Sequence, residues 1–482
     1  MPQRELIVQG DVPRALVRGL TQLADQLELP GDFPPEALAE ANRLAQSGPI
    51  DTSPRADMTD LEFVTIDPPG ANDLDQALLI EPHGTGFRVY YAIVDLAAWV
   101  APGGAIDAEA RLRGQTYYAP QTRLPLHPTA VSEAAASLLA QGSGRPANVW
   151  RMDLDADGAI TGFDVTRALV KSRAQLDYPG AQKQIESGTA PQTLMLLREV
   201  GQLRLAQEAA RGGVSLNLPE QEVIVRGHKW QLAFRSLAPV EQWNAQISLL
   251  TGYCAARMMR RAGVGLLRTL PPVTNTCIDL LHHIASTLGL DWPGTTGYAE
   301  FVRGLDPTRP DDQAMMNACT MLFRGAGYTV IGSAEDSGDM PHGALASEYA
   351  HITAPLRRLV DRFTGTICVS LSAGKPVPDW VLDGLDALPK IMQVSDRRAK
   401  AFERGVVALT EALTLSGRVG LKFMGVVIEI DPRDPKRGIA SLPSLAVEAP
   451  VQSSDPLTLG TEAMMTLVKA DARRGVVEFE LP

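Results

Sequence analysis

Three aspartates stand within nine residues of one another, directly after a short apolar run. Asp67, Asp73 and Asp75 lie in residues 65–77, and the apolar run occupies residues 61–66. Hard divalent cations such as Mg²⁺ prefer carboxylate oxygens and keep several waters that a phosphate group can displace. A strand that ends in a Pro-Pro-Gly turn would fix these carboxylates before a metal arrives, as metal-assisted phosphoryl chemistry requires. A solvated turn rich in Asp and Asn explains the same residues equally well, so the run alone leaves both interpretations open.

The charge of the chain does not by itself indicate a nucleic-acid-binding protein. The formal net charge is −11, whereas clustered Lys and Arg supply most of the affinity for nucleic acids. Net charge says little about local fields, however. Basic residues gather in four segments, residues 111–123, 257–268, 357–362 and 397–404. An acidic exterior around a basic internal groove would reconcile the two observations.

The composition also indicates the cellular compartment of the protein. No apolar run approaches the length of a membrane span, and the N-terminus carries no signal-peptide core. The four cysteines form no CxxC pair and argue against a zinc site or a disulfide scaffold; they are Cys254, Cys277, Cys319 and Cys368. We therefore expect a cytoplasmic protein with reduced thiols that does not enter a membrane.

The pattern of apolar residues predicts an α+β protein with three parts. We expect a small helical domain over residues 1–55, for which a helix-turn-helix-like fold is one candidate, a mixed-sheet domain with helices over 56–416, and an OB-fold β-barrel over 417–482. The expected strands of the first two parts are 61–67, 87–95, 148–154, 159–171, 222–226 and 230–235. The expected helices are 15–29, 35–46, 192–211, 240–262, 279–288, 312–324, 356–372 and 388–415. The expected strands of the tail are 422–430, 438–442, 463–469 and 475–481.

Five separated segments of the chain contain distinctive motifs in a fixed order. They read DPPGANDLDQA (67–77), VYYAIVDLAAWV (89–100), DAEARLRGQTYYAP (107–120), SRAQLDY (172–178) and YAHITAPLRRLVD (349–361). In this order they resemble the catalytic domain of the ribonuclease II / ribonuclease R family of 3′-to-5′ exoribonucleases, from about residue 58 to 415. The resemblance favours the functional interpretation of the acidic run and implies an RNB-type catalytic domain, with an RNA-binding OB barrel in the tail.

The resemblance implies a metal site in the acidic run. Asp67 and Asp73 match metal ligands, and Asp75 matches the carboxylate that is essential for cleavage, by metal binding or by handling the attacking water. The family's fourth acidic position is Gln76 here. An amide oxygen can ligate Mg²⁺ without contributing charge, so we expect a second ion to bind more weakly or to depend on the RNA phosphate.

The resemblance also implies residues that bind RNA. Tyr118 matches the aromatic that stacks on the 3′-terminal base, and Tyr178 matches a tyrosine that recognises sugar or base. Arg357 matches the arginine that grips the phosphate at the cleavage site, with Arg358 beside it. Glu403 lies where the family has a glutamate near the leaving nucleotide. The Pro-Leu-Arg-Arg context further predicts Arg357 in the first turn of a helix, where free backbone N–H groups suit a phosphate.

Other chemistry-bearing residues have structural interpretations. We expect His127, His282 and His283 to be structural, and His351 to be a satisfied structural histidine rather than a phosphate contact. The tryptophans Trp99, Trp150 and Trp243 suit the core. The remaining acidic residues of the motifs, Asp95 and Asp361, are expected to hold turns or arginines rather than metal.

These observations predict a monomeric 3′-to-5′ exoribonuclease that degrades single-stranded RNA to 5′-mononucleotides. We expect one or two Mg²⁺ ions, or Mn²⁺ in their place, and no organic cofactor. Family members usually carry two cold-shock-type barrels before the catalytic domain, and about fifty helical residues cannot encode them. Gln76 keeps open an alternative, a catalytically impaired RNA-binding or regulatory protein on the same scaffold. A hydrolase of small phosphoesters is disfavoured by the barrel-like tail and by Tyr118.

Overall fold

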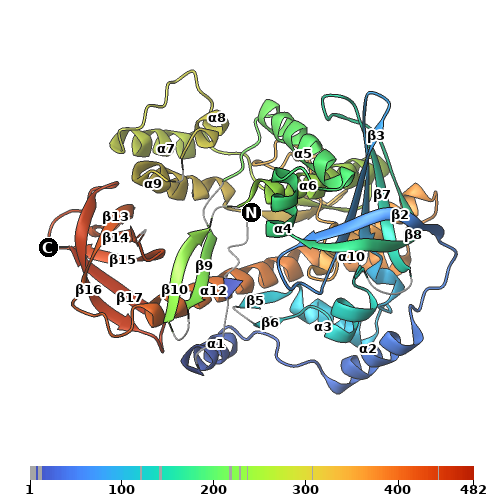
Figure 1. Ribbon diagram of the computed structural model, residues 1–482, viewed down its shortest axis with the longest axis horizontal. Coiled ribbons are helices and arrows are strands. Elements are labelled where there is room, and N and C mark those ends of the chain that lie inside the picture. Colours follow the sequence, from blue (N-terminus) through green and yellow to red (C-terminus); the bar gives the residue numbers. More distant parts are fainter. Residues whose placement is uncertain are drawn as a thin grey trace.

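Two small barrels lie at opposite ends of the molecule, and a long helix runs between them (Figure 1). The structure is a computed structural model that describes residues 7–8, 14–119, 122–140, 144–216, 220–226, 229–235, 237–306, 308–442 and 444–481. The long helix is α12 (Leu388–Thr414), which begins beside the first barrel and ends at the second. The mixed helix and strand content confirms the predicted α+β class.

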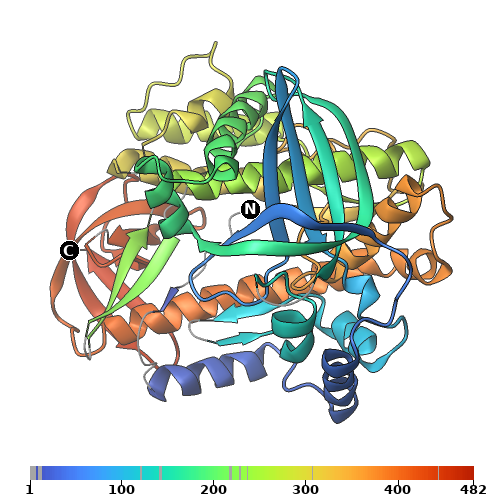
Figure 2. The same ribbon diagram turned by 45° about the vertical axis from the view of Figure 1, so that its right-hand side comes forward.

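The first barrel closes five strands in the order β2-β3-β4-β7-β8 (Figure 2). These strands are β2 (Ala56–Asp67), β3 (Gln76–His83), β4 (Gly86–Val94), β7 (Arg145–Leu154) and β8 (Ile160–Asp177). The parallel pairing of β2 with β8 sets Asp67 opposite Asp177. The acidic run therefore leaves the barrel at the end where the chain enters helix α4 (Tyr178–Glu186). Strand β3 was not predicted from the sequence, because polar residues of the acidic run obscure where it begins.

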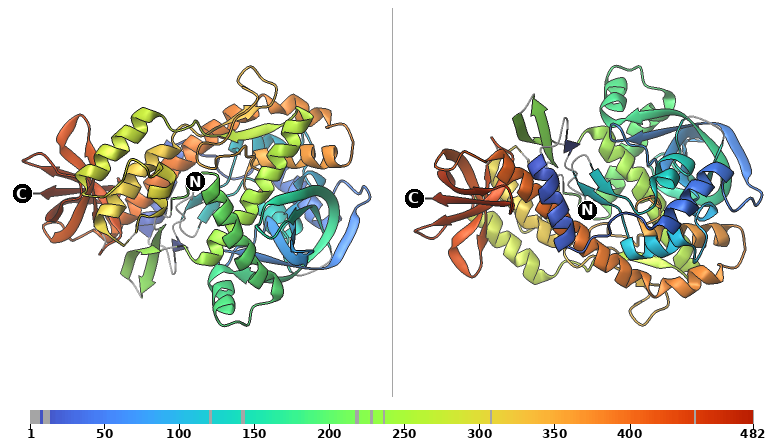
Figure 3. Two further views of the ribbon diagram at one scale, coloured as in Figure 1. Left: turned by 90° about the horizontal axis from the view of Figure 1, so that it is seen from above. Right: turned by 90° about the horizontal axis from the view of Figure 1, so that it is seen from below.

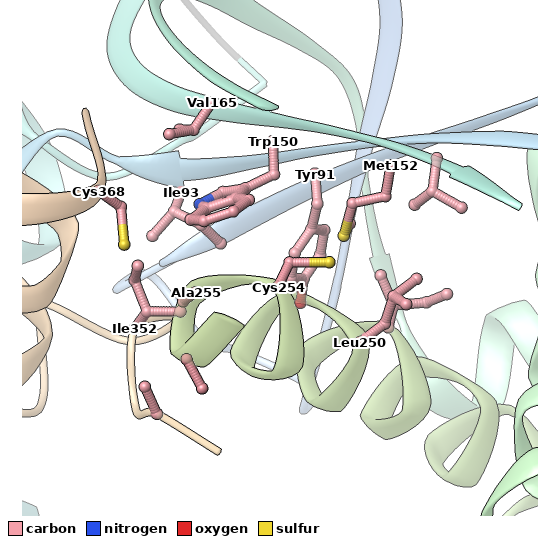
Figure 4. Close-up of a cluster of buried hydrophobic side chains, with 14 of the residues drawn as sticks. Tyr91, Ile93, Trp150, Met152, Val165, Leu250, Cys254, Ala255, Ile352 and Cys368 are labelled. Atoms are coloured by element: carbon pink, nitrogen blue, oxygen red, sulfur yellow. The ribbon is translucent and has the colours of Figure 1, made fainter. Parts of the chain in front are cut away.

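Helices cover one face of this barrel. They are α5 (Gln192–Ala210), α6 (Pro239–Ala262) and α10 (Leu359–Ser372). Side chains of alternating strand residues point at α6, where Tyr91, Trp150 and Met152 meet Leu250 and Cys254 (Figure 4). The tryptophans predicted for the core are at most 7% exposed; they are Trp99, Trp150 and Trp243. The buried apolar face fixes the register of the strands, because a slip of one residue would turn these side chains away from the helices.

The two N-terminal helices pack on different parts of the molecule. Helix α1 (Arg14–Gln26) lies along α12, with Leu16 and Leu20 against Phe402 (Figure 3). Helix α2 (Pro35–Ser47) packs instead on α3 (Ala105–Arg113) and on the π-helical turn η2 (Ala130–Ala135). The predicted boundary at residue 55 stays a prediction.

The C-terminal barrel confirms the predicted OB-type fold. Its strands are β13 (Lys422–Asp431), β14 (Asp434–Leu442), β15 (Val447–Ser453), β16 (Glu462–Asp471) and β17 (Val476–Leu481), closed in the order β13-β14-β15-β17-β16. Strand β15 was missed from the sequence because Pro450 interrupts its pattern. Val426 and Ile428 of β13 pack on a group of helices, namely α7 (Asn275–Thr287), α8 (Tyr298–Arg303) and α9 (Pro310–Cys319).

Short elements complete the fold. They are β1 (Ile7–Val8), η1 (Leu96–Ala98), β5 (Tyr117–Ala119), β6 (Thr122–Leu124), β9 (Glu220–Arg226), β10 (Lys229–Arg235), β11 (Leu266–Thr269), η3 (Thr320–Phe323), β12 (Gly327–Val330) and α11 (Asp379–Leu385). Among the helices that the structure describes, none combines the length and the apolar character needed to cross a lipid bilayer.

Candidate active site

Asp75 is the most enclosed carboxylate of the acidic run. Its side chain is 4% exposed, and Oδ1 accepts a hydrogen bond of 2.7 Å from the backbone N–H of Leu356. Its other oxygen, Oδ2, lies 3.7 Å from Nε of Arg357. Burial raises the pKa of the Asp75 carboxyl well above its usual value, although Arg357 and the Leu356 N–H act in the opposite direction. The carboxylate that follows the first barrel strand thus meets the arginine segment that lies 281 residues further along the chain.

The segment that carries Arg357 is held on three sides. Asp361 Oδ2 accepts hydrogen bonds of 2.7 Å from both the Ala354 N–H and Arg358 Nη2. From β3, Gln76 donates its amide N–H to the carbonyl of Thr353. The carbonyl of Arg357 itself accepts a 3.0 Å hydrogen bond from the Thr116 N–H. Arg357 is therefore fixed at its backbone while its side chain remains 39% exposed.

The prediction that Arg357 lies in the first turn of a helix is wrong. Helix α10 begins at Leu359, and Arg357 belongs to the turn before it. The N–H groups of Arg357 and Arg358 both donate to the carbonyl of Ala354, at 3.2 and 2.9 Å. Because these N–H groups form hydrogen bonds within the turn, they are not available to bind a phosphate. The guanidinium of Arg357 is therefore the group of this segment that can bind one.

Asp73 lies beside an arginine of the β5–β6 hairpin. Its Oδ1 accepts a 2.8 Å hydrogen bond from Arg123 Nη1. The same guanidinium reaches Glu133 through Nη2, at 2.7 Å. Tyr118 is the residue opposite Arg123 in the hairpin. Sequence reasoning placed Arg123 only in an arginine cluster, and its position opposite Tyr118 in the hairpin links it to the site.

Asp67 and Tyr178 lie at the neighbouring ends of β2 and β8. The Tyr178 hydroxyl accepts a 3.4 Å hydrogen bond from Asn244 of α6. Burial raises the pKa of Tyr178, and the charge of Asp67 raises it further. The same carboxylate and the Arg357 guanidinium also influence the pKa of Tyr91, which burial raises. Asp67, Tyr178 and Arg357 therefore share one neighbourhood.

Gln76 projects from the first residue of β3 toward α6. It lines a small pocket with five other residues, namely Val64, Ile66, Leu78, Tyr91 and Asn244. Because its amide nitrogen donates to the Thr353 carbonyl, its carbonyl oxygen Oε1 is the atom left for another partner. A carboxylate here could not make this hydrogen bond, since it has no donor. Gln76 thus ties the barrel to the arginine segment.

Two predicted RNA-binding residues, Arg358 and Glu403, lie in other surroundings than Arg357. Arg358 is largely buried, where it pairs with Asp361 through Nε and Nη2. Its charge lies near Tyr328 and Tyr349. Glu403 is half-buried on α12, next to Phe402 at the contact with α1. Direct contact of Arg358 or Glu403 with RNA stays a prediction.

Several arginines expected to line a basic groove instead pair with carboxylates. The pairs are Arg113 with Glu109, Arg260 with Asp336 and Glu348, Arg268 with Asp396, and Arg362 with Asp107. The last pair is almost fully buried, with side chains 1% and 2% exposed. These arginines hold segments together, which explains how arginine clusters coexist with an acidic chain.

Two of the other polar residues, His351 and Asp95, make the contacts that a structural role predicts. His351 is partly buried with Nδ1 2.7 Å from the Tyr328 hydroxyl, and desolvation lowers its pKa well below the usual value. Asp95 pairs with Arg55 and Arg167, at 3.2 and 2.8 Å. These residues brace the site and carry no expected role in binding metal.

His127 supplies a prediction about stability. Burial, together with the nearby Arg362 cation, lowers its pKa from 6.5 to about 3. The unfolded chain therefore binds a proton near pH 6.5 that the folded protein does not, so the free energy of unfolding falls as the pH decreases below that value. Replacing His127→Leu should reduce the loss between pH 7 and pH 5 by about 2 kcal/mol.

Urea unfolding at the two pH values measures this effect. The exposed His283 of α7 offers a matched control, because His283→Gln should leave the pH dependence as it is in the wild type. An equal loss in His127→Leu and the wild type would show that His127 does not contribute.

The donor atoms of the site fit a hard divalent cation. Asp67, Asp73 and Asp75 offer carboxylate oxygens and Gln76 offers an amide oxygen, which is the ligand type that Mg²⁺ and Mn²⁺ accept. They do not form a finished cage: within the described ranges, no three His, Cys, Asp or Glu side chains are grouped closely enough to hold an ion. Because Mg²⁺ is commonly held by one or two carboxylates, waters and substrate phosphates, an incomplete cage suits it.

Comparisons with known proteins agree with this geometry. The RNB domain model matches residues 55–367, and the model of the RNase II-type exonuclease C-terminal S1 domain matches residues 422–481. The chain belongs to the RNB family. The RNB model alone covers the first barrel, α6 and the Arg357 segment, so the family identity applies to the whole candidate site.

Individual proteins resemble the chain over most of its length. Ribonuclease R of Vibrio cholerae is 26% identical over 443 residues, which cover 85% of this chain and 53% of that protein. The chain thus spans about half the length of this relative. Mycoplasma genitalium RNase R, solved in complex with ribose methylated single-stranded RNA, superposes with a TM-score of 0.86 at 18% identity, over 97% of this chain and 78% of that one. Yeast Ssd1, a pseudonuclease, superposes with a TM-score of 0.68 at 16% identity, over 87% and 54%.

Proposed function

We propose that this protein is a metal-dependent hydrolytic exoribonuclease that degrades single-stranded RNA from the 3′ end to 5′-mononucleotides. The observation that carries the proposal is the position of Asp75, which accepts a hydrogen bond from the Leu356 backbone N–H and lies beside the Arg357 guanidinium. It brings a buried carboxylate and a partly exposed guanidinium to one point. Phosphodiester hydrolysis needs both, because a carboxylate acts on the attacking side while a cation offsets charge on the phosphate.

The residues of the chain divide the work as follows. Arg357 binds a non-bridging phosphate oxygen with its partly exposed guanidinium, which lies beside Asp75, while the Thr116 N–H holds the Arg357 backbone. Asp75 accepts hydrogen bonds and positions the attacking water. Tyr118 stacks on the terminal base and Tyr178 contacts the terminal sugar or base, with Arg358 and Glu403 as further contributors to RNA binding. A cation held by Asp67, Asp73, Asp75 and the Gln76 amide oxygen would activate the water and offset charge on the phosphate.

Further parts of the proposal concern the assembly. The ion is Mg²⁺, with Mn²⁺ as a substitute, in one or two copies. The active unit is a cytoplasmic monomer without an organic cofactor, divided near residues 55 and 416. The C-terminal barrel contributes to the binding of single strands, as barrels of this kind do.

Digestion of a 5′-labelled single-stranded RNA by the purified full chain tests the proposal. With Mg²⁺ we expect a ladder that shortens from the 3′ end and releases 5′-mononucleotides, and with EDTA we expect intact RNA. An RNA left intact with Mg²⁺ or Mn²⁺, under conditions where a known exoribonuclease digests it, would refute the proposal.

A second candidate function, an RNA-binding protein with impaired catalysis, is favoured by Gln76. The variant Gln76→Asp separates the two. We expect its rate with saturating Mg²⁺ to stay within about tenfold of the wild type, because an amide oxygen suffices as a ligand. Its unfolding temperature without metal should fall, because the hydrogen bond to Thr353 is lost and about 1–3 kcal/mol goes with it.

Gln76→Glu is the matched control, since it has the same length and also lacks the donor. A rise in rate of more than about 100-fold in Gln76→Asp, which corresponds to about 2.7 kcal/mol of transition-state stabilisation, would favour the impaired enzyme. The rates come from single-turnover digestion, and the stabilities from thermal unfolding in EDTA.

A further inference from the structure

Arg123 has an unusual position for a cation, between two carboxylates at the edge of the candidate metal site. Its Nη1 lies 2.8 Å from Asp73 Oδ1, and its Nη2 lies 2.7 Å from Glu133 Oε1. The three side chains are 26%, 15% and 22% exposed, so water screens the pairs only in part. One positive charge is thus shared by a predicted metal ligand and by a carboxylate outside the acidic run.

The backbone that carries the two carboxylates is fastened together. Ser137 donates its hydroxyl to the carbonyl of Asn72 at 2.6 Å and accepts from the Leu74 N–H at 3.0 Å. Leu138 N–H also donates to the Leu74 carbonyl, at 3.0 Å. The residues on both sides of Asp73 are therefore joined to the segment that follows Glu133, and the distance between the two carboxylates is largely fixed.

The arginine comes from a short hairpin. Among the described residues, strands β5 and β6 are three residues each and form a two-stranded sheet of their own, anchored by the buried Tyr117 against α12. The long Arg123 side chain is 26% exposed and can change rotamer while the hairpin backbone and the fastened backbone of Asp73 stay in place. If Asp73 moves away from Arg123, the guanidinium still pairs with Glu133. Separation of Arg123 from Asp73 therefore leaves no unpaired cation in a half-buried site.

We propose that Arg123 is a resident counter-ion that holds Asp73 in the metal-free protein and competes with the divalent cation for this carboxylate. Metal binding transfers Asp73 from the guanidinium to the ion, and Arg123 stays on Glu133. The inference rests on the proposed metal site.

The proposal predicts opposite effects for the two partners of the bridge. Arg123→Gln removes the competitor, so Mn²⁺ should bind about tenfold more tightly, as expected for one charge removed a few ångströms from a partly screened ion. Glu133→Gln removes the alternative partner and leaves the full charge on Asp73, so Mn²⁺ should bind about threefold more weakly. Arg123→Lys keeps the charge and should lie close to the wild type.

The measurement is the titration of chelator-treated full-length protein with Mn²⁺, in which the electron paramagnetic resonance signal of free Mn²⁺ reports binding without RNA. Arg88→Gln is the control. Arg88 lies at the end of β4 away from the site, where it pairs with Asp153 of β7, so its replacement should leave the affinity for Mn²⁺ unchanged. Thermal unfolding in EDTA verifies that each variant is folded.

Equal or weaker binding in folded Arg123→Gln, with wild-type protein that binds Mn²⁺, would overturn the role of Arg123 and leave the proposed nuclease function standing. Tighter binding in Glu133→Gln would overturn it as well. The nuclease function is judged separately by RNA digestion, so failure of one proposal does not imply failure of the other.

Discussion

Asp75→Asn should abolish RNA cleavage while RNA binding remains. An asparagine retains the oxygen that accepts the Leu356 N–H but loses the negative charge that faces Arg357. We expect the rate of single-turnover digestion to fall by at least about 10³-fold, the scale on which loss of a group at the reacting atoms acts. The affinity for a single-stranded RNA, measured by filter binding, should change by less than about threefold, an effect below 1 kcal/mol.

The stability of this variant gives an independent check. Because burial raises the pKa of Asp75, ionisation of this carboxyl opposes folding near neutral pH. Asp75→Asn should therefore unfold at the same temperature as the wild type or higher, in EDTA at pH 7.5. Asp153→Asn provides the control, since Asp153 is a partly exposed carboxylate that pairs with Arg88. Combined loss of folding and RNA binding in Asp75→Asn would identify Asp75 as a structural carboxylate.

Arg357→Ala is expected to have the second largest effect. The guanidinium is 39% exposed, and its backbone is held independently by Ala354, Thr116 and the Leu356 contact to Asp75. Removing the side chain should leave the segment in place and remove one charged partner of the phosphate. We expect kcat to fall by about 10²- to 10³-fold, as for loss of one preorganised donor to a transition state, with a smaller change in KM.

Arg357→Lys refines this prediction. A lysine keeps the charge but cannot form two parallel hydrogen bonds to phosphate oxygens, so it should recover only part of the lost rate. Arg88→Ala serves as the control for loss of an arginine that lies outside the site, on β4. A fall confined to KM in Arg357→Ala would place Arg357 in ground-state RNA binding rather than in catalysis.

Much of the fold followed from local patterns. Alternation of apolar residues predicted β2, β4, β7 and β8, and helical spacing predicted α5, α6 and α12, because each buries one face against a partner. Strand β3 was missed because acidic residues precede its start, and β15 was missed because Pro450 interrupts its pattern. The start of α10 was placed too early, because Arg358 has an extended backbone (φ −134°, ψ 123°) that separates the turn at Arg357 from the helix.

The candidate site could be predicted only in part. The resemblance to the ribonuclease II / ribonuclease R family indicated Asp67, Asp73, Asp75, Tyr118, Tyr178 and Arg357 as one set. Arg123 and Asn244 were not predicted as members, because their contacts to Asp73 and Tyr178 join residues 50 and 66 positions apart. Arg358 was expected to face RNA beside Arg357, yet its guanidinium pairs with Asp361, a choice that adjacent residues in a sequence cannot reveal.

The sequence by itself determined which chemical groups this protein has and which segments carry them, because the acidity of a carboxylate and the charge of a guanidinium belong to the residue. Only the tertiary structure decided which of these groups meet. Burial raises the pKa of Asp75, which lies beside Arg357. The Gln76 amide donates a hydrogen bond to the Thr353 carbonyl, and Arg123 forms an ion pair with Asp73. Each of these depends on distances and on exclusion of water between segments far apart in the chain, which no local pattern records.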